Sequence, residues 1–146
     1  MKSMQDLEIA KKRLKEKGLT LSIVKEEKAI FETSSHGISG VLNAIEKLGD
    51  KLNGASVADK VVGKAIALLC VYAKTKAVYA STLSNEARNV LEENAVYVEW
   101  EDLVANILDV DRKETCPFES LVAEILDSEE AYVKLKALQT SFRKCR

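Results

Sequence analysis

The sequence contains few of the residues that usually reveal a function. Of its 146 residues, three are cysteine (Cys70, Cys116 and Cys145), one is histidine (His36), and aromatic residues make up 5%. Three widely spaced cysteines do not form a disulfide framework, and they are typical of a reducing compartment. So few aromatic side chains argue against a surface on which nucleic-acid bases stack.

An excess of charge of one sign is also missing, since 22 basic and 23 acidic residues give a net charge of −1. Nucleic-acid binders and polybasic membrane anchors usually have a basic surplus, so we expect neither partner. The longest uncharged apolar run, Ala65 to Ala73, is too short to cross a bilayer. The polar first residues predict no signal peptide. We therefore expect a cytoplasmic protein.

What remains is the composition of a globular protein, with 47% apolar and 31% charged residues. A chain of this length is typical of one domain. The sequence contains no recognisable linker or internal repeat. We predict a single domain over residues 1–146, with flanking helices at both ends.

Hydrophobic periodicity predicts alternating helices and strands. The stretch 57–74 is apolar on nearly every side, which is typical of a helix buried against a sheet. Strands that alternate with helices after Gly54 imply parallel pairing, and a hairpin precedes them. We predict an α/β fold, a three-layer α/β/α sandwich around a mixed sheet. Its elements are helices at 3–17, 38–49, 57–74, 84–91, 103–108, 117–126 and 128–144, and strands at 19–24, 29–33, 77–80 and 96–100.

Two motifs carry a resemblance to a known family. They are the run GASVADKVVGKA at residues 54–65 and the shorter run CPFE at residues 116–119. With these motifs the chain resembles a prokaryotic family called domain of unknown function 1893. The resemblance extends from about Leu19 to about Val122, and it implies a cytidine deaminase-like fold.

The same resemblance implies that the zinc site of the deaminases is lost. In zinc deaminases a His or Cys, followed by Ala and Glu, opens the buried helix, and Pro-Cys-x-x-Cys opens the next helix. In the register that we infer, Val57 replaces the first zinc ligand and Asp59 the proton-shuttling Glu, while Ser84 and Ala87 replace the two cysteines. Valine and alanine do not coordinate zinc, and one serine does not hold it alone. We expect neither a metal nor another cofactor.

Without zinc, the site implied by the resemblance is framed by two helix N-termini, whose unpaired N–H groups favour anions. On a helix that begins at residue 57, Lys60 and Lys64 lie one turn apart on the same face and could reach one anion. Alternatively, both lysines are solvated, and Asp59 caps the helix by a capping box with Ser56. The predicted ligand-binding residues are Ser56, Asp59, Lys60, Lys64 and Ser84.

Cys116 is the candidate nucleophile. Pro117 suits the first position of a helix, which makes Cys116 its N-cap. A thiol in that position can have a lowered pKa and react as a thiolate. Asp59 or His36 would assist it. The alternatives are that Cys116 is an inert buried thiol and that His36 is merely solvated.

Three functions follow from these readings. The first is a binding or regulatory module that holds a small anionic molecule where the zinc site used to be. That the molecule is nucleotide-like is implied by the fold resemblance alone. The second is a zinc-independent enzyme in which Cys116, with Asp59, carries out sulfur or acyl transfer. The third is a structural subunit of a homo-oligomer.

Overall fold

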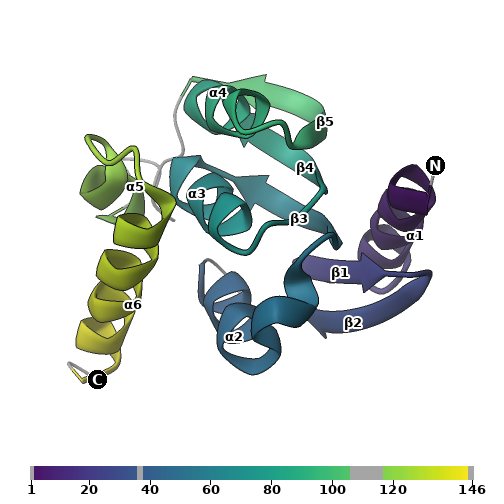
Figure 1. The fold of residues 1–146 in the computed structure, drawn as a ribbon, viewed down its shortest axis with the longest axis horizontal. Helices are drawn as coiled ribbons and strands as arrows, with labels where there is room; N and C mark the ends of the chain where they lie inside the picture. Colours follow the sequence, from purple (N-terminus) through teal and green to yellow (C-terminus); the bar gives the residue numbers. More distant parts are fainter. Residues whose placement is uncertain (1, 36–37, 106–116, 145–146) are drawn as a thin grey trace.

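The centre of the structure, a computed structural model that describes residues 2–35, 38–105 and 117–144, is a five-stranded mixed sheet (Figure 1). The strand order is β2-β1-β3-β4-β5. Strand β1 is antiparallel to both of its neighbours, whereas β3, β4 and β5 are parallel to one another. The strands are β1 (Leu21–Lys25), β2 (Lys28–Thr33), β3 (Ser56–Val62), β4 (Ala77–Ser84) and β5 (Tyr97–Val104).

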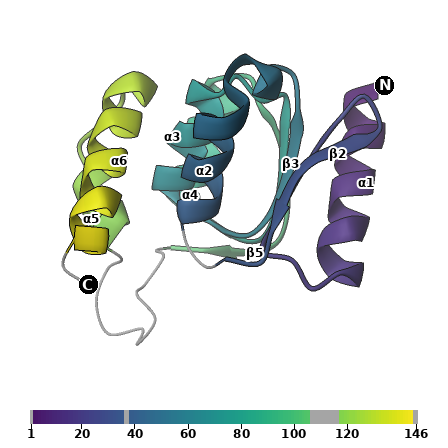
Figure 2. The same ribbon diagram turned by 90° about the horizontal axis from the view of Figure 1, so that it is seen from below.

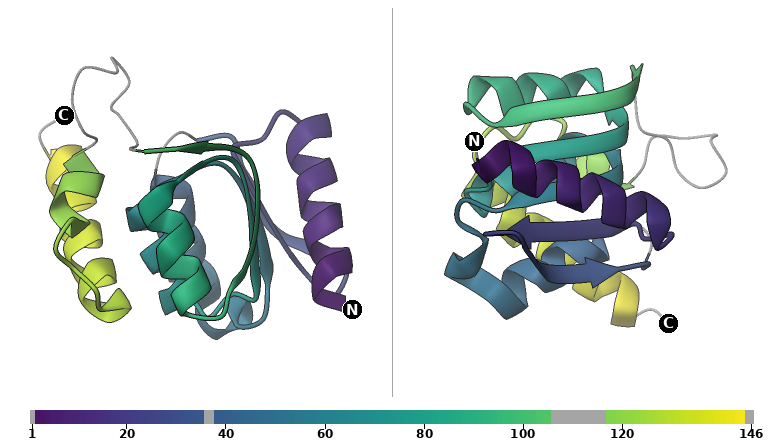
Figure 3. Two further views of the ribbon diagram at one scale, coloured as in Figure 1. Left: turned by 90° about the horizontal axis from the view of Figure 1, so that it is seen from above. Right: turned by 90° about the vertical axis from the view of Figure 1, so that its right-hand side faces the viewer.

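Helices cover both faces of the sheet. Helix α1 (Lys2–Glu16) lies on one face, and α2 (Ser39–Leu48), α3 (Lys64–Tyr72) and α4 (Asn85–Glu93) lie on the other (Figure 2). A 3-10 turn, η1 (Gly49–Leu52), follows α2. The predicted α/β sandwich around a mixed sheet is confirmed. Helices α5 (Pro117–Val122) and α6 (Ser128–Lys144) add a further layer outside α3 (Figure 3).

The position of α3 between two layers explains why it is apolar all round. One side packs towards the sheet, and the opposite side packs on α5 and α6. The rings of Tyr72 and Tyr132 stack between α3 and α6 with their centroids 4.5 Å apart. Ile125, Ala131 and Leu135 join the same core. The C-terminal helices therefore complete the burial of α3.

The prediction of one helix over 57–74 is wrong, because strand β3 occupies the first part of that stretch. Val57, Val61 and Val62 are β-branched and favour a strand. Gly63 follows with an extended backbone, φ −101° and ψ −176°, and is the N-cap of α3. A buried strand and a buried helix are both apolar, so hydrophobicity alone does not separate them.

Two smaller differences concern the C-terminal third. Leu103 lies in β5 instead of the predicted helix at 103–108, of which residues 106–108 lie outside the described residues. Helix α5 ends at Val122 instead of residue 126, whereas α6 has the predicted bounds. Among the residues that the structure describes, no helix combines the length and the apolar character needed to cross a membrane.

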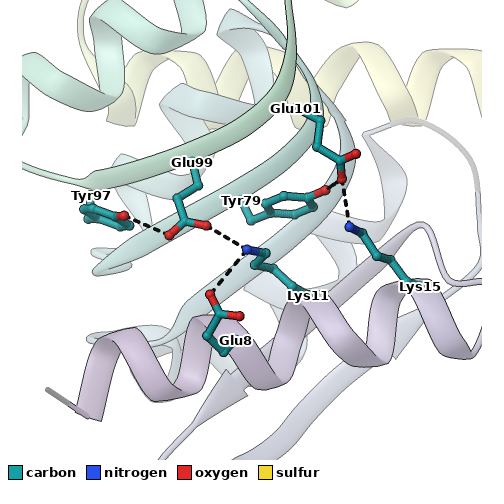
Figure 4. Close-up of polar contacts among 7 residues, drawn as sticks. All are labelled: Glu8, Lys11, Lys15, Tyr79, Tyr97, Glu99 and Glu101. Carbon is teal, nitrogen blue, oxygen red and sulfur yellow. Dashed lines mark hydrogen bonds and ion pairs between the residues drawn. The ribbon is translucent and has the colours of Figure 1, made fainter.

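Helix α1 is fixed to the sheet by a second small core and by ion pairs. Leu7, Ala10 and Leu14 pack with buried residues of the sheet. At the far side of the helix, the ammonium of Lys11 lies 2.9 Å from a carboxylate oxygen of Glu99 on β5 (Figure 4). The ammonium of Lys15 lies 2.9 Å from Glu101, which also accepts a hydrogen bond from the Tyr79 hydroxyl. These lysines connect α1 to the edge strand β5, beyond its apolar contacts.

Candidate functional site

Helices α3 and α4 begin side by side at the carboxyl ends of two parallel strands. Val62, the last residue of β3, pairs with Leu83 of β4. The N-caps that follow, Gly63 and Ser84, therefore lie at the same end of the sheet. The Ser84 hydroxyl accepts a hydrogen bond of 3.1 Å from the N–H of Ala87. This confirms the prediction that Ser84 opens a helix.

The N-terminus of α3 binds a carboxylate that comes from a distant part of the chain. The Glu119 side chain on α5 accepts hydrogen bonds from the N–H of Lys64 at 2.7 Å and of Ala65 at 2.8 Å. We call these two bonds the Glu119 contact. The first N–H groups of a helix have no partner within the helix and carry partial positive charge, so a carboxylate is favoured there.

Gly63 makes room for this carboxylate. A Cβ atom at position 63 would lie 2.4 Å from one carboxylate oxygen of Glu119 and 2.8 Å from the other. Such distances are far below a van der Waals contact. Any side chain at position 63 would therefore force Glu119 away from the two N–H groups.

Lys64 strengthens the attachment of α5. It is only 7% exposed, and its ammonium donates a hydrogen bond of 2.9 Å to the carbonyl oxygen of Ala123, just after α5 ends. Cations are favoured at the C-terminal end of a helix, where carbonyl oxygens lack partners. The main chain and the side chain of Lys64 therefore hold the two ends of α5.

The Glu119 carboxyl lies in an environment that disfavours its charge. Burial raises its pKa above the usual range, and the negative charge of Glu86 on α4 acts in the same direction. The hydrogen bonds from Ala65 and Lys64 and the charge of Lys64 oppose this shift. The negative charge of the Glu119 carboxyl is therefore less favourable in the folded protein than in water.

Asp59 is buried in β3, with 6% of its surface exposed. Burial raises the pKa of its carboxyl to about 7, although hydrogen bonds from the N–H groups of Val61 and Lys60 lower it. Burial, and then the negative charge of Asp59, raises the pKa of the Cys70 thiol on α3 to about 12. A carboxyl that titrates near neutral pH has the property a proton carrier needs. Its catalytic role stays a prediction.

Two of the predicted arrangements are wrong because residues 56–62 form a strand. Ser56 is the first residue of β3, where it pairs with Ala77, and so lies at the opposite end of the strand from the Glu119 contact. It forms no capping box with Asp59. Lys60 is an exposed strand residue, so it does not share a helix face with Lys64. Of the predicted ligand-binding residues, Lys64 and Ser84 lie at the same end of the sheet, each where a helix begins.

The register that we inferred from the zinc ligands of the deaminases changes for the same reason. Helix α3 opens with Gly63, Lys64 and Ala65, so Val57 and Asp59 do not stand at its beginning. Ser84 and Ala87 do open α4, as expected. Over residues 2–35, 38–105 and 117–144, no group of three or more His, Cys, Asp or Glu side chains is placed to hold a metal ion.

From the residue types at the beginning of α3 and α4 we predict that the protein does not bind zinc stoichiometrically. Glycine and alanine have no side-chain ligand atom, and zinc sites in proteins need three or four such ligands. Elemental analysis of protein purified without chelator should give far less than one zinc per chain. A stoichiometric zinc that resists dialysis against a chelator would contradict this prediction.

Cys116, His36 and Cys145 lie outside the described residues, so the proposed nucleophile and its assistant stay predictions. The sequence reasoning missed Glu119 and Gly63 as parts of the site. The signal that a strand ends and a helix begins at Gly63 was its place between a valine-rich run and a run of good helix formers.

Comparisons with known proteins place the chain beside one family. A family model described as "Domain of unknown function (DUF1893)" matches residues 9–138. The crystal structure of TM1506, a DUF1893 family protein from Thermotoga maritima, is similar over 91% of this chain and 89% of that one, with 30% identity and a TM-score of 0.84.

Weaker matches are the two structures of RibD from Acinetobacter baumannii, called form 1 and form 2. They have 19% and 20% identity and TM-scores of 0.48 and 0.44, over 68% of this chain and 34% of RibD. No curated protein matches the sequence.

Proposed function

The chain belongs to the DUF1893 family, and we propose that it is a binding or regulatory module for a small anionic molecule. The binding site in this proposal is the N-terminus of α3. The observation that supports it is the Glu119 contact, in which two N–H groups already hold a carboxylate. The N-terminus of α4 lies at the same end of the sheet and contributes a second partial positive charge.

In this proposal the ligand exchanges with Glu119. A phosphate or carboxylate group takes the place of the Glu119 carboxylate on the N–H groups of Lys64 and Ala65. The Lys64 ammonium leaves the carbonyl oxygen of Ala123 and pairs with the ligand. A phosphate dianion has more charge and more acceptor oxygens than a side-chain carboxylate, so it competes best. A nucleotide-like ligand, which the fold resemblance implies, carries such a group.

The first test removes the competitor. We expect Glu119→Ala to bind adenosine monophosphate at least about tenfold more tightly than the unaltered protein, because the two N–H groups become free. Isothermal titration calorimetry measures both affinities. Glu124→Ala is the matched control, since it removes an exposed carboxylate from the same region and should leave the affinity unchanged.

Two further variants locate the ligand. In the Glu119→Ala protein, Lys64→Ala should weaken binding by roughly tenfold or more, which is the loss of one charge-assisted hydrogen bond. Lys60→Ala should have no effect, because Lys60 is exposed on β3. If Glu119→Ala binds neither adenosine monophosphate nor inorganic phosphate, or if Lys64→Ala behaves like Lys60→Ala, the proposal is wrong.

A further inference from the structure

Helix α6 packs on the rest of the protein with one side only. Ala131 and Leu135 are buried in the core, and α6 forms the outermost layer in Figure 2. The opposite side of the helix carries residues spaced three or four positions apart, which therefore lie in one row along it. We call this row the outer stripe. It consists of Leu126, just before the helix, and of Glu129, Val133, Ala137, Thr140 and Lys144.

The outer stripe exposes apolar side chains. Leu126 is 86% exposed and Val133 is 61% exposed, the two highest values for large apolar residues in the described part of the chain. Ala137 is exposed as well. Exposed apolar residues that share one surface indicate a contact with another molecule. The small side chain of Ala137 leaves room for a second helix to approach closely.

Charge is segregated along the same helix. Residues 127–130 have a charge of −3 without a basic residue, and residues 131–144 have a charge of +4 without an acidic one. Two ion pairs, of Glu130 with Lys134 and of Lys136 with Glu46, involve three of these charges. The others are Asp127 and Glu129 at one end and Arg143 and Lys144 at the other.

This order of charges stabilises an isolated helix, because acidic residues are favoured at its N-terminus and basic residues at its C-terminus. The helix dipole does not explain why apolar residues are exposed on the same stripe. The stripe is also symmetric about position 135, since Val133 and Ala137 lie two positions from it and Leu126 and Lys144 lie nine. A surface with this symmetry is complementary to itself when the second helix runs in the opposite direction.

We propose that the outer stripe is the contact surface of a two-fold homodimer, in which α6 packs antiparallel on α6 of a second copy. Val133 of each copy then faces Ala137 of the other, and the acidic end of each helix faces the basic end of the other. Opposite charges in these positions set the orientation, because parallel helices would bring like charges together. A two-fold dimer uses the same surface of both copies, as this stripe requires. The inference is independent of the proposed anion site.

The concentration dependence of the mass tests the proposal. A contact one helix wide is smaller than a standard interface, so we expect a dimer with a Kd of about 10 μM. Sedimentation velocity of the whole protein should show mostly monomer at about 1 μM and mostly dimer at about 200 μM. In an NMR dilution series, the amide shifts that change with concentration should lie in residues 126–144. A monomer at the highest concentration would overturn the proposal.

Val133→Lys tests the apolar centre of the contact. It places a charge in the middle of the interface, so the dimer should weaken by roughly tenfold or more. Because Val133 is exposed, the melting temperature of the monomer should stay unchanged. Val61→Lys is the matched control, since it alters an exposed valine of β3 and should dimerise normally. Equal dimerisation of the two variants would contradict the proposal.

Charge reversal tests the antiparallel orientation. Glu129→Lys and Lys144→Glu each bring like charges together at both ends of the contact, so each variant should dimerise at least about tenfold more weakly. In an equal mixture of the two variants, opposite charges meet again at both ends. The mixture should therefore form a heterodimer with an affinity within about threefold of the unaltered dimer. Single variants that dimerise normally, or a mixture that stays monomeric, would show that this pairing is wrong.

Discussion

Replacing Asp59 by asparagine is expected to make the protein more stable at neutral pH, by up to about 4 kcal/mol. The folded carboxyl has a pKa of about 7, against an ordinary value of 3.8. As the pH rises from about 4 to about 7, the unfolded chain releases this proton while the folded chain retains it. The free energy of unfolding therefore falls through this window and stays lower above it. Asparagine carries no charge and avoids this loss.

Urea unfolding at pH 4, 5.5 and 7.5 measures the effect. The unaltered protein and Asp59→Asn should be similar at the lowest pH and diverge as the pH rises. Asp50→Asn, which removes an exposed carboxyl, is the control and should follow the unaltered protein. If Asp59→Asn and the unaltered protein keep a constant difference at all three pH values, buried Asp59 is not the source of the pH dependence.

Gly63→Ala is expected to destabilise the protein by about 3–6 kcal/mol, the sum of two hydrogen bonds to a charged group. The new Cβ would lie 2.4 Å from the Glu119 carboxylate and would displace it. The protein then loses two hydrogen bonds to a charged group, each of which contributes about 1.5–3 kcal/mol. The backbone of Gly63 has a negative φ that alanine can adopt, so the substitution adds no backbone strain of its own.

A double-mutant cycle checks this cause. In the Glu119→Ala protein, Gly63→Ala should change the free energy of unfolding by less than about 1 kcal/mol, because the displaced group is already absent. Urea unfolding of the two single variants and the double variant completes the cycle. Additive effects of the two substitutions would show that Gly63 acts on something other than Glu119.

Where a local signal was strong, the sequence alone predicted the helix or strand correctly. The helical spacing of apolar residues after Asp127 predicted α6 with its observed bounds. Ser84 was recognised as the beginning of α4. The hairpin and the strands at 77 and 97 were also recognised, because each has alternating or β-branched residues between turn signals. The motif at 54–65 led to the family that the comparisons show.

The candidate site could be predicted only in part. Ser84 was correctly placed at the N-terminus of a helix. Lys64 was chosen because it lies one turn from Lys60 on a helix predicted to begin at residue 57, whereas in the structure it is the first residue of α3. Lys60 was assigned wrongly, because the apolar stretch that contains it was interpreted as one helix. Asp59 was selected because it takes the place of the proton-shuttling Glu in the register that the resemblance implies, but its burial, and therefore its pKa, depends on helices that pack over the strand.

The sequence by itself therefore determined the class of fold, the family and most of the elements, because periodicity, caps and turns depend on residues within a few positions of one another. The tertiary structure alone decided that residues 56–62 are a strand and that Glu119 fills the N-terminus of α3. In that contact Glu119 lies 55 positions along the chain from Lys64 and 54 positions from Ala65. It exists because α5 and α6 fold back over α3 to cover its apolar outer side, and no local pattern in the sequence specifies which carboxylate such packing brings there.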